Sequence, residues 1–112
     1  MLTKRAVEII RRMAAAEARE DYENAEIVCD SLTCRLGEDL VSRRTVMALL
    51  RHTAISTASE PGSLERYVLS GSGRKMAVDP SVADRVMAAI ISGVNCDEEG
   101  NPLPREGEPA GP

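Results

Sequence analysis

The chain has 112 residues and a formal net charge of −4, and 43% of its residues are hydrophobic while 29% are charged. This composition suits one folded domain with a single modest core, and no apolar run approaches the roughly 20 residues that a membrane-spanning helix needs. The absence of Trp and Phe, with only two Tyr, argues against proteins that bind single strands by stacking bases on aromatic side chains.

The charge is distributed unevenly along the chain. Residues 1–42 carry a net charge of −3, residues 43–75 carry +4, and residues 95–112 carry −4. A uniformly acidic enzyme does not require such an asymmetry. The chain thus has a basic middle between acidic ends, which the mean charge alone does not reveal.

Two helices are predicted in the first third of the chain. The first begins after Thr3, which can cap it, and ends in the polar run 18–24, because its apolar residues recur at the helical period. Asn24 predicts the N-cap of a second helix that ends at Gly37. The apolar run 27–29 could instead begin a strand.

A third helix is predicted over residues 42–53, after a tight connection at 37–40. Ser42 is its expected N-cap, and the apolar face contains Val46, Leu49 and Leu50. The opposite face carries Arg44, Ala48, Arg51 and His52, with Thr45 and Met47 at its edges.

A β-hairpin is predicted after the third helix. Residues 54–57 and 66–70 are prone to form strands, and the loop 58–63 between them contains a Pro-Gly pair. Residues 71–73 end the hairpin, and residues 74–78 are expected to form a single helical turn.

The last predicted helix has the clearest boundaries. Asp79 is its expected N-cap, Pro80 its first residue and Gly93 its end. Its apolar residues span roughly 200° of the circumference, more than the ~100° stripe of a surface helix. This face either covers the small core or, as we expect, forms a homodimer through residues 80–92. The Pro- and Gly-rich residues 95–112 are expected to be a disordered acidic tail after a domain at 1–94.

This order of elements resembles a winged helix-turn-helix domain over about residues 3–92. The run GEDLVSRRTVMALLRHTAIS (37–56) resembles the turn and the recognition helix. The run RYVLSGSGR (66–74) is similar to the last wing strand and the following helix of bacterial regulators of the MarR and PadR type, although the chain lacks the long pair of dimerisation helices. The resemblance implies a mainly α domain with a small β-hairpin that binds DNA.

Two arginines at the start of the third helix support this implication. Arg43 and Arg44 lie in the first helical turn, where a cation opposes the helix dipole at about 0.3–1 kcal/mol. Phosphates or guanine edges of DNA would turn this cost into a gain. Arg44 and Arg51 are seven residues apart, about 10 Å along one face, which fits a helix in a major groove. Glu38 and Asp39 could instead pair with the first two arginines on an ordinary solvated surface.

We therefore predict an interface for double-stranded DNA, with a recognition helix at about 42–53 and a wing at about 54–70. Its predicted contact residues are Ser42, Arg43, Arg44, Thr45, Met47, Ala48, Arg51, His52, Arg66, Arg74 and Lys75.

No metal, cofactor or catalytic site is predicted. On a helix Cys29 and Cys34 would lie about 140° apart, too far apart to share a metal ion. The odd number of cysteines, without an export signal, predicts free thiols at both and at Cys96, in the reducing cytoplasm. His52 has no serine or cysteine motif to activate and is expected to face DNA or solvent.

The sequence thus predicts a small cytoplasmic winged-helix protein that binds DNA and regulates transcription without enzymatic activity. The alternative is a winged-helix module that binds a protein and no DNA, such as an accessory protein of a phage or mobile element. The salt dependence of binding distinguishes the two. Each phosphate contact contributes about −0.9 to the slope of the logarithm of the binding constant against the logarithm of the salt concentration.

Overall fold

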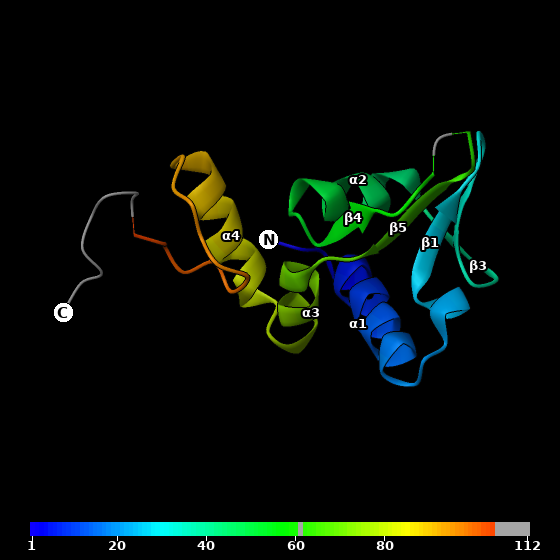
Figure 1. Cartoon of the computed structure of the whole chain (residues 1–112), viewed down its shortest axis with the longest axis horizontal. Helices are drawn as coiled ribbons and strands as arrows, with labels where there is room; N and C mark the ends of the chain where they lie inside the picture. Colours follow the sequence, from blue (N-terminus) through cyan, green and yellow to red (C-terminus); the bar gives the residue numbers. More distant parts are fainter. Residues whose placement is uncertain (61, 105–112) are drawn as a thin grey trace.

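The structure is a computed structural model that describes residues 1–60 and 62–104. The fold is α+β, and in the described residues its five strands form one antiparallel sheet in the order β3-β2-β1-β5-β4 (Figure 1). The elements in chain order are α1 (Lys4–Ala18), the 3₁₀ turn η1 (Tyr22–Asn24), β1 (Glu26–Cys29), β2 (Cys34–Leu36), β3 (Asp39–Val41), α2 (Arg43–Arg51), β4 (Ile55–Thr57), β5 (Glu65–Leu69), α3 (Gly71–Val78) and α4 (Ser81–Ile91).

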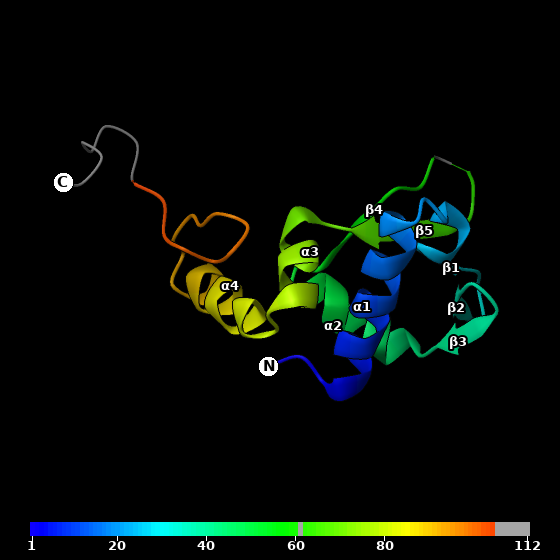
Figure 2. The same cartoon turned by 90° about the horizontal axis from the view of Figure 1, so that it is seen from below.

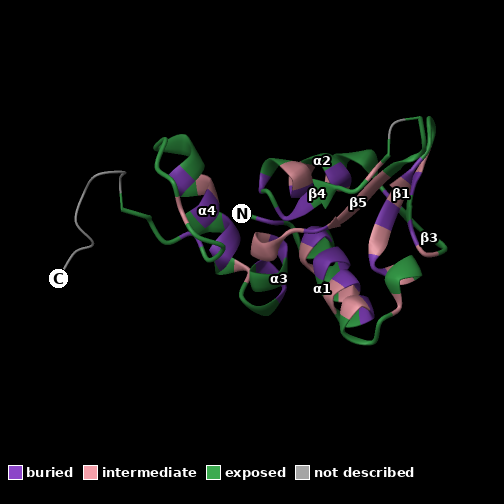
Figure 3. Ribbon diagram, in the orientation of Figure 1, coloured by how far each residue is buried: buried purple, intermediate pink, exposed green. Residues whose placement is uncertain are grey.

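The first helix forms as predicted. The Thr3 side chain accepts a hydrogen bond from the backbone N–H of Ala6 at 3.1 Å, which satisfies one of the free donors at the start of α1. Ile9, Ile10 and Met13 are fully buried on its inner face. α1 packs against α2, α3 and β5, so the core lies between these helices and the sheet (Figure 3).

The second predicted helix is wrong, because residues 24–36 form η1, β1 and β2 instead. Burial alternates along the chain, with Ile27, Cys29, Cys34 and Leu36 facing the core, and this period of two belongs to a strand. A helix would also have placed Leu32 in the core, but Leu32 is 88% exposed in the turn between the strands. The sheet is therefore larger than the single hairpin that the sequence predicts.

The third helix and the hairpin after it are confirmed as α2, β4 and β5. α2 ends in a Schellman motif, in which Ala54 N–H donates to the Leu49 carbonyl and Thr53 N–H donates to the Leu50 carbonyl. Thr53 therefore adopts a φ of +59°, a conformation that a β-branched residue rarely takes. This turn leads directly from α2 into β4.

α3 is longer than the single turn predicted, because it begins at Gly71. The Ser70 side chain caps it by accepting from the backbone N–H of Gly73. A side chain at Gly73 would collide with the carbonyl oxygen of Ala54, so glycine allows α3 to lie close to the start of β4. The sequence suggested only that these glycines end the hairpin.

α4 lies at the end of the molecule away from strands β1–β3 (Figures 1 and 2). α4 begins at Ser81, one residue later than predicted, with Pro80 at the cap position, and the Asp79 carboxylate accepts from the N–H of Ser81. Gly93 takes a φ of +67° after the end of the helix, as the sequence predicts. Residues 95–104 also differ from the expected disordered tail, because Cys96 forms a β-bridge with Pro102 and Gly100 is buried against α4. The rest of the predicted tail, residues 105–112, lies outside the described residues.

No helix within the described ranges is both long enough and apolar enough to cross a membrane.

Candidate nucleic-acid interface

The outward face of α2 is the candidate interface, and the helix start is fixed by local hydrogen bonds. The Ser42 Oγ accepts from the backbone N–H of Thr45 at 3.1 Å and lies 2.8 Å from the Thr45 Oγ1. Val46 and Leu49 are buried on the inner side. Their burial fixes the rotation of the helix, so the positions between them face outward.

Arg44 and Arg51 lie on this outward face and have no partner among the described residues. This sets them apart from the other nine described arginines, each of which donates a hydrogen bond or forms an ion pair within the chain. Those nine are Arg5, Arg11, Arg12, Arg19, Arg35, Arg43, Arg66, Arg74 and Arg85. The two exposed guanidinium groups without a partner are therefore concentrated on one helix face.

The same face presents an apolar side chain between the two arginines. Met47 is 52% exposed, and Ala48 beside it is half-buried. A guanidinium, a thioether and a second guanidinium thus follow each other at positions i, i+3 and i+7 of one helix. Figure 3 shows α2 with its exposed side turned away from the sheet.

Arg43 is exposed but is held by two groups of its own chain. Its Nη2 donates to the backbone carbonyl of Asp30 at 3.0 Å, and its Nη1 lies 3.9 Å from a carboxylate oxygen of Glu65. The upstream carboxylates do not hold it, since Asp39 pairs with Arg12 at 2.7 Å. No local sequence pattern indicates these contacts, because they depend on the register of β1 and β5.

His52 does not face DNA or solvent, so that prediction is wrong. The residue is 8% exposed, and its Nδ1 lies 2.9 Å from the carbonyl oxygen of Ala48. The physical reason is that α2 ends at Arg51 and the chain reverses at Thr53. The imidazole is thereby folded onto the last helical turn and out of the candidate interface.

The predicted contact residues beyond α2 are engaged elsewhere. Arg66 pairs with Glu26 across the sheet, and Lys75 lies 3.5 Å from a carboxylate oxygen of Glu99. Arg74 donates two hydrogen bonds of 2.9 Å to the carboxylate of Glu17, which raises the pKa of the arginine. A DNA phosphate would have to displace these carboxylates.

The hairpin loop is acidic rather than basic. Glu60 and Glu65 are exposed at the ends of the turn between β4 and β5, where the sequence predicts a wing. Leu64 is 49% exposed beside them. The hairpin therefore offers no free cation to a nucleic acid in its described residues.

No family model, curated protein or solved structure matches this chain. The candidate interface therefore depends on the geometry of α2 and its surroundings alone.

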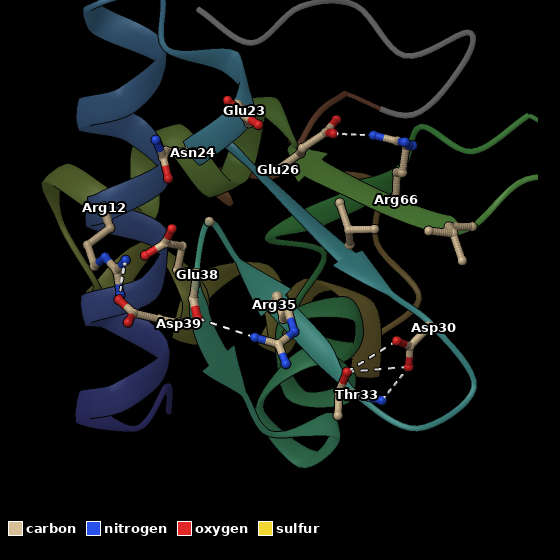
Figure 4. A pocket seen from close by; sticks show the side chains of 13 residues that line it. Arg12, Glu23, Asn24, Glu26, Asp30, Thr33, Arg35, Glu38, Asp39 and Arg66 are labelled. Atoms are coloured by element: carbon tan, nitrogen blue, oxygen red, sulfur yellow. Dashed lines mark hydrogen bonds and ion pairs between the residues drawn. The ribbon is translucent and has the colours of Figure 1, made fainter.

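A polar pocket on the open face of the sheet is the other prominent feature (Figure 4). It has a volume of about 780 Å³, and two ion pairs join four of its charged side chains. Arg12 pairs with Asp39, and Arg66 pairs with Glu26. The backbone N–H groups of residues 33 and 32 bind the Asp30 carboxylate and lower its pKa.

The carboxylates that line this pocket are of two kinds (Figure 4). Glu26 and Asp39 pair with arginine, and Asp30 accepts hydrogen bonds from its own turn. The carboxylates of Glu23 and Glu38 have no partner among the described residues. In residues 1–60 and 62–104 no three side chains of His, Cys, Asp or Glu come together as a metal site would require.

The cysteines differ from the prediction of three free thiols. Cys29 and Cys34 form a disulfide, while Cys96 is free and half-buried. The prediction failed because it assumed a helix, on which the two thiols diverge. In the antiparallel register of β1 and β2 the two residues are direct partners.

The apolar band of α4 is only partly covered. Val82, Ala83, Val86 and Ala89 are buried, whereas Ile91 is 79% exposed. The homodimer through residues 80–92 stays a prediction.

Proposed function

We propose that this chain binds double-stranded DNA through the outward face of α2. The observation that carries the proposal is the pair Arg44 and Arg51, the two described arginines without a partner in their own chain. Long cationic side chains that are exposed and unengaged can contact phosphates without breaking an internal bond. Their concentration on one face separates them from scattered surface charge.

The spacing along α2 suits the major groove. Seven residues of helix advance by about 10 Å, which is close to three base-pair steps of ~3.4 Å. A guanidinium can bind the O6 and N7 atoms of guanine with two hydrogen bonds, and an apolar group such as that of Met47 can contact a thymine methyl. The face therefore combines groups that contact phosphates with groups that can recognise bases.

The winged-helix assignment belongs to this proposal. Its support is the order in which α2 is followed by the hairpin β4–β5 and then by α3, as expected for a recognition helix, a wing and the next helix. The chain departs from a helix-turn-helix where β2 and β3 replace the helix before α2. Because the hairpin loop is acidic, we assign DNA contact to α2 and not to the wing.

The proposed role is that of a small transcriptional regulator in the cytoplasm. A second copy, held through α4 as the sequence predicts, would present a second α2 and allow a two-fold symmetric site to be bound. The exposed Ile90 and Ile91 are the residues available for such a contact.

The deciding experiment compares two double variants of equal charge. Selection from random duplexes with the purified chain supplies a preferred site, and its affinity is then measured by fluorescence anisotropy from about 50 mM salt upward. The Arg44→Ala/Arg51→Ala variant is expected to lose at least about tenfold in affinity, with a log–log salt slope about two contacts shallower. The control is Arg19→Ala/Arg85→Ala, which removes two arginines distant from α2 and should keep both values. Equal binding by the two double variants would refute the assignment to α2.

A protein partner is the second candidate, supported by the acidic hairpin loop. Leu64 is about half exposed between Glu60 and Glu65 in the sequence, and such a mixture suits a partner with basic and apolar side chains. If the wild-type chain retains no duplex from the random pool at about 50 mM salt, this function replaces DNA binding.

A further inference from the structure

The Cys29–Cys34 disulfide joins two strands at the tip of the sheet. Cys29 is the last residue of β1 and Cys34 the first residue of β2, and the two are direct partners in the antiparallel register. Their side chains are almost completely buried, at 1% and 2% exposure. The bond therefore closes the exposed turn 30–33 from its inner side.

Both groups that hold Arg43 lie next to Cys29, one in the chain and one across the sheet. The carbonyl that accepts from the Arg43 Nη2 belongs to Asp30, which directly follows Cys29. The carboxylate near the Arg43 Nη1 belongs to Glu65, which is the β5 partner of Cys29 in the sheet. These two contacts therefore connect the first residue of α2 to the chain around Cys29.

Reduction of the disulfide favours a movement of the two strands that it joins. A covalent bond holds two sulfur atoms closer together than two unbonded thiols can pack. Both cysteines are buried in the packed interior, which leaves little room for the thiols to separate by side-chain rotation, so we expect β2 to shift relative to β1. β3 and β2 are the two outer strands on one side of the sheet, and β3 leads through Ser42 directly into Arg43. A shift of these two strands would therefore move Arg43 relative to Asp30 and Glu65 while β1, β5 and β4 keep their pairing.

We propose that the Cys29–Cys34 pair is a redox switch that withholds Arg43 from an anionic ligand when oxidised and releases it when reduced. The link to DNA affinity rests on the proposed function of α2. The switch adds a third arginine to the face that already presents Arg44 and Arg51.

The chemistry is ordinary thiol–disulfide exchange with a low-molecular-weight dithiol or two equivalents of a monothiol. The reductant's thiolate attacks one protein sulfur, the S–S bond breaks, and a mixed disulfide forms while the other cysteine leaves as a thiol. A second reductant thiol then displaces the remaining cysteine, so the protein gains two electrons and two protons and the reductant becomes a disulfide. In a reducing compartment a protein disulfide is typically transient and sensing, which is consistent with this role.

The test measures duplex affinity in both oxidation states, confirmed by counting alkylated thiols by mass spectrometry. The reduced protein is expected to bind about fivefold more tightly, with a log–log salt slope steeper by about 0.9 because one phosphate contact is added. The Cys29→Ser/Cys34→Ser variant should behave like the reduced protein without any reductant. Cys96→Ser should keep the full redox response, since that thiol is outside the pair.

Two arginine variants show whether Arg43 mediates the response. Arg43→Ala is expected to bind equally in both oxidation states. Arg44→Ala should weaken binding in both states and preserve the ratio between them. The proposal would be overturned if the wild type had the same affinity for the duplex in both oxidation states. It would also be overturned if Arg43→Ala kept the wild-type ratio of reduced to oxidised affinity.

A second measurement does not depend on DNA. Hydrogen exchange of the Leu32 and Thr33 amides reports the turn, because both amides donate to Asp30. Their exchange should accelerate at least about tenfold on reduction, and identical exchange in both states would overturn the switch. Accelerated exchange without DNA binding in either state would instead refute the proposed function and keep the release of Arg43.

Discussion

α2 and α3 are two short helices with similar sequences, but their basic side chains are used differently. Each begins at a serine cap, and each carries two consecutive basic residues. In α3, Arg74 and Lys75 pair with carboxylates from α1 and from the segment after α4. In α2, Arg44 has no partner in the described chain. The difference teaches that a basic pair on a short helix is a candidate interface only where the fold brings no acid to it.

The largest expected change in stability tests the close packing of α3 against the start of β4. Gly73→Ala would place a methyl group against the carbonyl oxygen of Ala54, which is backbone and cannot rotate away. We expect a loss of about 2–3 kcal/mol in unfolding free energy, measured by urea denaturation. Gly71→Ala is the matched control, since its neighbour is the flexible side chain of Glu98, and it should be neutral or slightly stabilising. Equal losses in both variants would contradict this close packing.

The next effect tests whether the cation of α3 is structural. Arg74→Ala removes a two-bond contact with Glu17, whose side chain is 22% exposed. A destabilisation of about 1 kcal/mol is expected, because Arg74 itself is half exposed and solvent weakens the pair. A double-mutant cycle with Glu17→Gln measures the coupling, and a coupling near zero would remove the contrast with α2.

The third effect concerns the strained residue at the end of α2. Thr53→Gly should stabilise the protein by about 0.5–1 kcal/mol, because glycine accepts the positive φ at less cost than a β-branched residue. Thermal unfolding provides the measurement. Ser56→Gly, in the regular strand β4, is the control and should lower the melting temperature.

The smallest effect has the opposite sign to that of Arg74. Arg44→Ala removes a cation from the first turn of α2 and breaks no internal contact among the described residues. Stability is expected to rise by about 0.3–1 kcal/mol at low salt, and to rise less at high salt, while DNA affinity falls. A loss of stability on this substitution would show that Arg44 is structural after all.

The sequence was sufficient to predict elements whose ends carry local signals. Thr3, Ser42 and Asp79 mark helix starts, and the Pro-Gly loop marks the hairpin, because capping and turn chemistry act over a few residues. It was insufficient for β1 and β2, where a run of apolar residues fits a helix or a strand and only pairing with β5 decides. The disulfide and the buried His52 were missed for the same reason, since both follow from how the chain reverses.

The candidate interface was predictable in part. The amphipathic pattern of 42–53 placed Arg44, Met47 and Arg51 outward, and the structure keeps them there. The pattern had no information on which acid would reach which base. Glu17 and Glu26 are distant in sequence from their arginine partners. Only the tertiary structure therefore shows that Arg66 and Arg74 are engaged within the chain.

The segment after α4 has a practical consequence for work with fragments. Gly100 sits against Arg85 and the backbone of Val86, and Pro102 and Ala89 line the same groove, so this segment covers part of one flank of the last helix. A truncation at residue 94, where composition places the domain boundary, would remove this segment and expose an apolar surface that promotes aggregation. Expression plasmids for this protein should therefore extend at least through residue 104.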